Sequence, residues 1–292
     1  MTAAARDSRP VALVTGAGAG IGLATAIRLA AEGYLVAVND VDPVAAAEAV
    51  HRLGPDHLAV AGDVSSEAAA ERIVAEVLSR FGRLDALVNN AGVADGAIPA
   101  LDQSIETFRR TLSVHADGCF LVSRAAARAM MMSSGSCRGG AIINLSSIAG
   151  QVGIPNCIAY AAAKGAIVTM TRVLACEWAA HGIRVNAVAP GYVRTDLVDG
   201  LIRASKLDER GIVARTPMRR LARPEEIASV VAFLAGAGAS YVTGATIPVD
   251  GGYLAFGAPF DASEGGLSCP DTALGQYVTA DRDISPSNGE QR

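Results

Sequence analysis

The sequence predicts an α/β fold in which helices cover both faces of a doubly wound parallel sheet. Of the 292 residues, 51% are hydrophobic and only 4% are aromatic, so the core is expected to be aliphatic. Short apolar runs alternate along the chain with stretches of helical spacing. Strands buried on both faces of a parallel sheet are apolar throughout, and their alternation with helices favours right-handed crossovers. We therefore expect about seven strands in one sheet.

Capping residues place the elements in order. Gly33 follows a helical stretch as a C-cap, and Asp42 precedes Pro43 as an N-cap before a first helical residue. Pro224 begins a further helix with two acidic residues in its first turn. The predicted strands are 11–14, 35–38, 58–61, 86–89, 141–145, 184–189 and 246–249. The predicted helices are 20–32, 43–53, 66–81, 104–132 and 160–180, with one more starting at 224.

Three segments fall outside this alternation. Residues 133–140 are typical of a turn-forming loop. Residues 196–218 form a long connection between a strand and a helix, where we expect a functional lid. Residues 255–292 are rich in Gly, Ser, Pro and Asp, and we expect an extension that covers the pocket, reaches a neighbouring subunit or stays loose. Residues 1–254 would then form a single domain.

Charge and composition exclude several classes of function. The net charge of −4 and the lack of a long basic run argue against nucleic-acid binding. No apolar run reaches the ~18 residues expected of a membrane span, and residues 1–10 lack the apolar core of a signal peptide. The cysteines form no CxxC pair, so we expect a cytoplasmic protein without a zinc site or disulfide framework. They are Cys119, Cys137, Cys157, Cys176 and Cys269.

A glycine-rich stretch, TGAGAGIG at 15–22, joins the first predicted strand to the first helix. Glycines let the backbone approach a pyrophosphate, and the helix N-terminus favours its negative charge. An ordinary glycine-rich turn is the alternative, but the position between a buried strand and a helix favours nucleotide binding. The expected contacts are Gly16, Gly18, Ala19, Gly20, Ile21 and Gly22.

Asp40 ends the second predicted strand, about twenty residues beyond the glycines. A carboxylate at this point accepts hydrogen bonds from the adenosine ribose and repels a 2′-phosphate. Neither Ala19 nor Asn39 supplies a positive charge to offset it. The sequence therefore favours NAD over NADP, although an exposed loop aspartate would look the same.

Tyr160 and Lys164 lie four residues apart in a predicted helix and so project from one face. A free tyrosine has a pKa near ~10, and a neighbouring cation lowers it by favouring the phenolate. A tyrosine tuned in this way can serve as general acid or base. Ser147, at the end of a predicted strand, would supply a hydroxyl for a substrate oxygen. Alone, the YxxxK pair is weak, because any helix carries it by chance.

With these features the chain resembles the short-chain dehydrogenases/reductases over residues 9–254, a family with a Rossmann-type sheet. Residues 15–22 are similar to its TGxxxGxG motif, 89–92 (NNAG) to a motif that lines the cofactor, and 190–195 to its PGxxxT segment. Ser147, Tyr160 and Lys164 match the family's catalytic residues in identity and spacing. The cofactor contacts that the resemblance adds are Asp63, Val64, Asn90, Ala91, Gly92, Tyr160, Lys164, Pro190, Gly191, Val193 and Thr195.

The resemblance also implies a mechanism and an assembly. Tyr160 would exchange a proton with the substrate oxygen while hydride moves to or from the nicotinamide. Lys164 would bind the nicotinamide ribose and lower the pKa of Tyr160, and Ser147 would orient the substrate oxygen. Members are usually homotetramers that pack two long helices, here 104–132 and 160–180, against symmetry mates.

His115 departs from the family pattern, which usually has an asparagine at this place, where it helps to hold a water in the proton relay from the lysine. A histidine also donates and accepts hydrogen bonds and titrates near neutral pH. We hypothesise that His115 is catalytic in the sense that it keeps the relay. The alternative is a helix histidine that satisfies a polar group in the core.

Together these features predict an NAD-dependent oxidoreductase that interconverts a secondary alcohol and a ketone. The expected pocket walls, 94–98, 148–156 and 192–215, are mostly apolar or small, with Gln151 and Asn156 as polar exceptions, which favours a hydrophobic or cyclic substrate. The alternatives are an NADPH-dependent 3-oxoacyl thioester reductase and a non-catalytic NAD-sensing protein. A basic group is expected to be solvated or to meet another subunit, and comprises Arg215, Arg219, Arg220 and Arg223.

Overall fold

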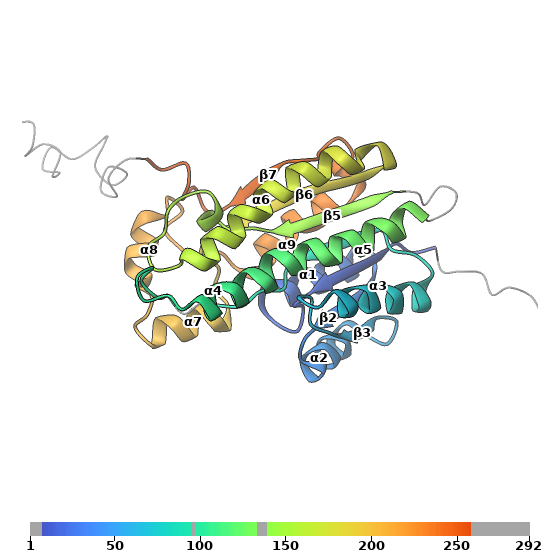
Figure 1. The fold of residues 1–292 in the computed structure, drawn as a ribbon, viewed down its shortest axis with the longest axis horizontal. Helices are drawn as coiled ribbons and strands as arrows, with labels where there is room; N and C mark the ends of the chain where they lie inside the picture. The colour runs from blue at the N-terminus through green and yellow to red at the C-terminus, as the bar shows by residue number, and fades with distance from the viewer. Residues whose placement is uncertain (1–7, 95–96, 133–138, 258–292) are drawn as a thin grey trace, which may run out of the picture.

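One seven-stranded parallel sheet organises the molecule (Figure 1). The computed structural model describes residues 8–94, 97–132 and 139–257. The strand order is β3-β2-β1-β4-β5-β6-β7, so the direction of winding reverses between β1 and β4. The predicted fold class is confirmed. The strands are β1 Val11–Thr15, β2 Leu35–Asp40, β3 Leu58–Ala61, β4 Ala86–Asn89, β5 Gly140–Leu145, β6 Ile183–Pro190 and β7 Thr246–Val249.

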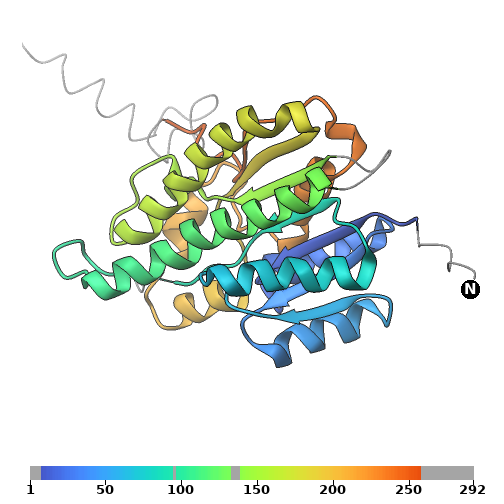
Figure 2. The same cartoon turned by 45° about the vertical axis from the view of Figure 1, so that its right-hand side comes forward.

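Helices cover the two faces of this sheet. Figures 1 and 2 show α3, α5 and α6 side by side on one face, and α1 and α9 pack together on the other. The caps expected at Asp42 and Pro43 are present, because the Asp42 side chain accepts a hydrogen bond from the Val44 N–H. The helices are α1 Gly20–Ala31, α2 Pro43–Leu53, α3 Glu67–Phe81, α4 Ile105–Leu112, α5 Gly118–Met132, α6 Ile158–Trp178, α7 Asp196–Arg203, α8 Glu209–Arg215 and α9 Pro224–Ala235.

Two aliphatic cores lie between the sheet and these helix layers. Along β1, Val11 and Leu13 point into the core beneath α3, α5 and α6, whereas Ala12 and Val14 point into the core beneath α1 and α9. All four side chains are fully buried. This explains the uninterrupted apolar runs, since a strand covered on both faces has no side that favours polar residues.

The helix predicted over 104–132 is not a single α-helix. It divides into α4 and α5, separated by a π-helical turn over Ser113–Asp117. Such insertions are rare and concentrate at functional sites. The turn carries His115, whose side chain is 4% exposed. Side-chain periodicity alone could not reveal this turn, because the flanking helices have the same apolar spacing.

By length and composition alone, the segment Ile158–His181, α6 with the short turn after it, is apolar enough to cross a membrane. In the fold it is a core helix. It packs against β6 and against α4, and its buried face includes the polar residues Lys164 and Thr171.

The predicted lid segment contains two helices, α7 and α8, joined by a short connection. Beyond β7 the chain makes turns over residues 251–255. Residues 133–138 of the predicted loop and residues 258–292 of the predicted extension lie outside the described residues, as do Cys137 and Cys269.

Candidate active site

A cavity of about 860 Å³ opens at the carboxyl ends of the strands. Its wall includes residues that follow β1, β2, β4, β5 and β6, together with residues of α4, α6 and α7. This edge of a doubly wound sheet is where ligands bind, beside the reversal of strand order. The volume lies within the range of small-molecule and cofactor sites.

The glycine-rich loop is shaped by close backbone contacts. Gly16 and Gly20 have φ of +59° and +56°, which residues with a side chain rarely adopt. A Cβ on Gly22 would lie 2.4 Å from the carbonyl oxygen of Gly16. Gly16, Ala19, Gly20 and Ile21 line the cavity as predicted, whereas Gly18 and Gly22 lie outside its lining. The structure therefore gives Gly22 a packing role and gives Gly18 a contact with Asp40.

Asp40 and Asp63 lie in the cavity wall at the ends of β2 and β3. The Gly18 N–H donates to Oδ2 of Asp40 at 3.0 Å, and the Asp42 N–H donates to Oδ1 at 3.1 Å. Oδ1 of Asp63 accepts hydrogen bonds from both the N–H and the hydroxyl of Ser65. Each carboxylate is thus oriented by its own turn while remaining part of the wall.

Thr15 joins the glycine-rich loop to the segment after β4. Its Oγ1 accepts hydrogen bonds from the N–H groups of Asn90 and Ala91. The Asn90 side chain donates in return to the carbonyl oxygens of Thr15 and Gly16, at 3.0 and 2.8 Å. Asn90, Ala91 and Gly92 all line the cavity. The sequence offers no sign of the role of Thr15, because its partners lie about 75 residues away.

Ser147, Tyr160 and Lys164 meet in the same cavity wall. Ser147 is at the end of β5 and accepts a hydrogen bond from the Ala149 N–H at 3.1 Å. Nζ of Lys164 lies 5.4 Å from the ring centroid of Tyr160 and donates to the carbonyl oxygen of Leu145 at 2.6 Å. Burial lowers the pKa of Lys164 to about 8, so the side chain remains mostly a cation at pH 7.

Polar side chains beneath the site hold α6 against β5. The Ser146 hydroxyl donates to the backbone carbonyl of Lys164 at 2.9 Å, and Asn144 donates to the Thr171 hydroxyl at 2.9 Å. Asn89 donates to Oδ1 of Asn144 at 2.8 Å. All of these side chains are buried. No local pattern in the sequence singles out Asn144, Ser146 or Thr171, although the first two are part of the stretch that ends at Ser147.

His115 lies against Tyr160, with ring centroids 5.3 Å apart and planes at 86°. Its Nε2 lies 2.9 Å from the carbonyl oxygen and 3.1 Å from the amide nitrogen of Val93, so the tautomer decides which bond forms. Burial, and then the charge of Lys164, lower the pKa of His115 to about 3. The imidazole is therefore neutral near pH 7. A Cβ on Gly92 would lie only 2.3 Å from its Cε1.

The remaining predicted contacts also lie in the wall. Val64, Pro190, Gly191, Val193 and Thr195 line the cavity. Of the expected substrate walls, Gln151 does not line it, whereas Asn156 does. Leu197 and Leu201 of α7 and Leu207, all in the predicted lid segment, add an apolar surface, and Arg110 of α4 also reaches the wall. No group of three or more metal-binding side chains occurs among the described residues.

The basic group divides by exposure: Arg220 and Arg223 are exposed, whereas Arg215 and Arg219 are half-buried against neighbours within the chain. The Arg215 guanidinium lies 4.8 Å and 5.1 Å from the ring centroids of Tyr253 and Phe256. Arg219 donates to the carbonyl oxygen of Ala214, and Arg220 pairs with Glu226.

These residues fit an extended dinucleotide. The glycine-rich loop opens α1 beside the cavity, so backbone N–H groups are available to a pyrophosphate. The carboxylates of Asp40 and Asp63 stand at one end, and Tyr160 and Lys164 line the same cavity beyond the loop. Donors and acceptors are thus of the kinds that phosphates, ribose and adenine require.

Comparisons with known proteins agree with this arrangement. A family model described as enoyl-(acyl carrier protein) reductase matches residues 16–254. An uncharacterised short-chain type dehydrogenase/reductase of Sinorhizobium fredii is 42% identical over 87% of this chain, which spans 45% of that protein's length. The cis-4-hydroxycyclohexanecarboxylate dehydrogenase of Sinomonas cyclohexanicum is 44% identical over 84% of this chain and 96% of its own. A solved structure from Sinorhizobium meliloti, provisionally assigned as a short-chain alcohol dehydrogenase, has a TM-score of 0.79 at 38% identity, over 84% of this chain and 96% of that chain.

The chain belongs to the short-chain dehydrogenase/reductase family. Because the relatives with a stated activity are dehydrogenases or reductases, it is an oxidoreductase of the nicotinamide-dependent type.

Proposed function

We propose that this protein is an NAD-dependent oxidoreductase that interconverts a secondary alcohol and a ketone by hydride transfer. The observation that carries the proposal is a single cavity lined by Ser147, Tyr160, Lys164 and, at its other end, Asp40. When bound, the nicotinamide supplies the hydride chemistry. The side chains of the protein bind the cofactor, orient the substrate and move the proton.

The proton chemistry falls to Tyr160. The Lys164 cation lies close to the Tyr160 ring, where it would stabilise the negative charge that develops on the phenol during proton transfer. One N–H of Lys164 is bound to Leu145, and the other two are available to ribose hydroxyls and the site. The Ser147 hydroxyl orients the substrate oxygen beside Tyr160. Neutral His115 holds Val93 and contacts the Tyr160 ring, which is a positioning role rather than that of a cationic relay.

The preference for NAD rests on Asp40. Backbone N–H groups fix its carboxylate at the cavity wall, where a 2′-phosphate would meet a negative charge. Asp40→Ala should lower the ratio of kcat/KM for NAD to that for NADP by about 10- to 100-fold, since each tenfold step is about 1.4 kcal/mol. Steady-state kinetics with both cofactors measures this ratio. An unchanged ratio would place cofactor choice elsewhere.

We further propose an apolar, alicyclic secondary alcohol or its ketone as the substrate. The leucines of the lid face the cavity, and the Sinomonas relative is named for a hydroxylated cyclohexane. One alternative is the reduction of a 3-oxoacyl thioester with NADPH, since a relative from Synechocystis, 37% identical over 84% of this chain, is named a 3-oxoacyl-[acyl-carrier-protein] reductase.

The test is a panel of cyclic, linear and hydroxyacyl alcohols with NAD or NADP, followed by the absorbance of the reduced nicotinamide. Turnover of cyclic alcohols with NAD, lost in Tyr160→Phe while cofactor binding persists, would support the proposal. NAD binding without any turnover would favour a sensor, and activity confined to 3-oxoacyl thioesters with NADPH would favour the reductase.

The family resemblance suggests the assembly, and the composition of the sequence suggests the location. We propose a homotetramer in the cytoplasm, with α4, α5 and α6 at the subunit contacts. Phe120 on α5 and Val173 on α6 are exposed apolar side chains of the kind such contacts use. Sedimentation velocity at several protein concentrations tests the tetramer.

A further inference from the structure

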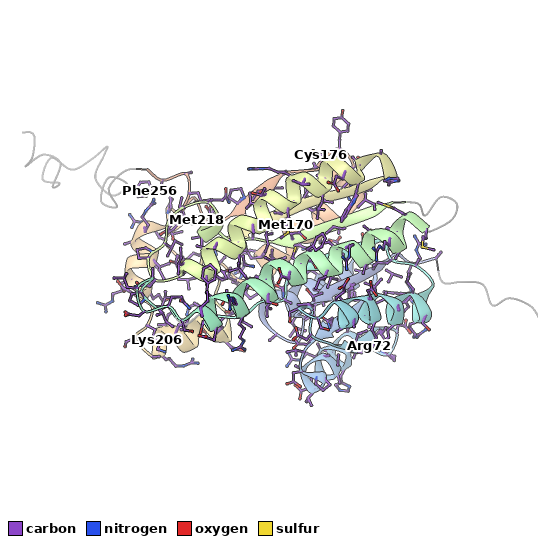
Figure 3. The ribbon with its side chains drawn as sticks, viewed as in Figure 1. Arg72, Met170, Cys176, Lys206, Met218 and Phe256 are labelled. Atoms are coloured by element: carbon purple, nitrogen blue, oxygen red, sulfur yellow. The ribbon has the colours of Figure 1, made fainter. Side chains whose placement is uncertain are left out.

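The lid helix α8 is fastened to the segment that follows β7. Arg215, its last residue, lies 4.8 Å from the ring centroid of Tyr253 and 5.1 Å from that of Phe256. Both distances are within the range of cation–π attraction. We call Arg215, Tyr253 and Phe256 the aromatic clamp. Figure 3 shows Phe256 and Met218 close together at the end of the molecule that holds α8, with Lys206 on the opposite side of that end.

Close backbone contacts hold the segment after β7 against the residues that follow α8. The Met218 N–H donates to the carbonyl oxygen of Gly251 at 3.1 Å. A Cβ on Gly251 would lie 2.9 Å from the Thr216 side chain, and one on Gly252 would lie 3.0 Å from Pro217. Residues 251–256 therefore follow the end of α8 closely.

The same segment contacts the cavity wall through Tyr253. Its ring lies 5.9 Å from that of Tyr192, with planes at 61°, and Tyr192 lines the cavity. Burial, and then Tyr253, raise the pKa of Tyr192 to about 12, so the Tyr192 phenol is neutral at ordinary pH. Tyr253 thus contacts Tyr192 in the cavity wall on one side and Arg215, the last residue of α8, on the other.

Besides the clamp, α8 is held by the buried side chain of Ile212 and by ion pairs that are exposed. Arg194 pairs with Asp199 of α7 and with Glu209 of α8, and its side chain is 49% exposed. Exposed ion pairs are screened by solvent and stabilise little. The three side chains of the aromatic clamp are partly buried, so their contacts are screened less than these ion pairs.

We propose that Tyr253 is a positioning residue that determines substrate specificity. Its ring sets the distance between the lid and the part of the cavity wall formed by Tyr192. The kinetic consequence rests on the proposed function, but the structural consequence does not. Without the ring, α8 and the connection to α7 would open more often, and the apolar surface of Leu197, Leu201 and Leu207 would be poorly placed. The Asp40 end of the cavity has no contact with the clamp.

Limited trypsin digestion tests the structural part, because Lys206 is exposed in the connection between α7 and α8. Tyr253→Ala should speed cleavage after Lys206 by about fivefold or more, since cleavage follows local opening. Tyr253→Phe keeps the ring and should behave as wild type. Tyr241→Ala is the matched control, because Tyr241 is fully exposed. Should Tyr253→Ala fail to fold, Arg215→Gln removes the same clamp from the other side and carries the same expectation.

Kinetics tests the specificity part. In Tyr253→Ala the KM for a bulky apolar alcohol should rise about five- to tenfold, with kcat and the KM for NAD within about twofold of wild type. Cleavage at the wild-type rate in both clamp variants, or equal acceleration in Tyr241→Ala, would overturn the proposal. If the protein turns over no alcohol, the proposed function fails, while digestion still decides whether the clamp holds the lid.

Discussion

At the scale of single residues, burial decides how the ionisable groups of the site behave. Lys164 and His115 are both 4% exposed, and burial lowers the pKa of each. The outcomes differ because their ordinary values differ: Lys164 remains mostly protonated at pH 7, whereas His115 is neutral. A neutral imidazole between Val93 and Tyr160 can hold its neighbours in place. It cannot pass on a proton as an imidazolium in this pH range.

His115→Asn should make the protein more resistant to acid. The pKa of His115 falls from 6.5 to about 3 on folding. Between these values the unfolded chain binds the extra proton, so the folded state loses stability as the pH falls through this window, by at most about 1.4 kcal/mol per pH unit. Between about pH 6.5 and pH 5, the unfolding free energy measured with urea should fall by about 1.5 kcal/mol more in the wild type than in His115→Asn. An equal loss in both proteins would show that His115 is not held neutral.

The candidate site was partly predictable at this scale. Residues fixed by local spacing, such as Tyr160 with Lys164, could be selected because a helix places them on one face. Thr15, Asn144 and Thr171 could not, since their partners lie on other strands and helices and only the folded chain brings them together.

At the scale of elements, the π-helical turn and the loop after β4 fit one another. The turn carries His115 to within van der Waals contact of Gly92, and only a residue without a side chain fits there. The sequence shows both residues but not their contact, because the chain separates them by 23 positions. The apolar spacing correctly predicted a helix on both sides of the turn. It could not predict the turn itself, because the flanking residues keep the same spacing whether or not a π turn interrupts the α-helix.

Gly92→Ala should destabilise the protein strongly when His115 is present and much less in a His115→Ala background. The added Cβ would lie 2.3 Å from the imidazole, which must shift against Tyr160 and Val93. A double-mutant cycle of unfolding free energies should give a coupling of about 1–3 kcal/mol. Gly153→Ala is the control, since a Cβ there has no neighbour within 4 Å. Additive effects would mean that the contact is relieved elsewhere.

At the scale of the whole molecule, the sheet was the most predictable feature. All seven predicted strands are present within about two residues of their expected bounds, because burial on both faces removes polar residues from them. The order of the strands follows from crossover rules rather than from any single residue. What could not be foreseen is how the segment after β7 joins the lid, since that contact depends on the completed sheet.

Leu13→Ala should test the double-sided core. Leu13 lies at the centre of the sheet and is fully buried, so its truncation leaves a cavity and should cost about 2–5 kcal/mol of unfolding free energy. Leu101→Ala is the matched control, because Leu101 is fully exposed and its truncation should change stability by less than about 0.5 kcal/mol. Chemical denaturation measures both.

The hydrogen bond from Lys164 to the end of β5 bears on whether this part of the site could be transplanted into a related protein. Ser147 lies two residues after the end of β5, and Tyr160 and Lys164 lie on α6. Hydrogen bonds from Lys164 and Ser146 join α6 to the end of β5. The groups to which we assign the proton transfer therefore occupy one uninterrupted stretch of chain, residues 140–178, whereas the proposed dinucleotide end draws on strands from across the sheet. A transplant of this stretch between relatives would carry the catalytic geometry with it and leave cofactor preference to the recipient.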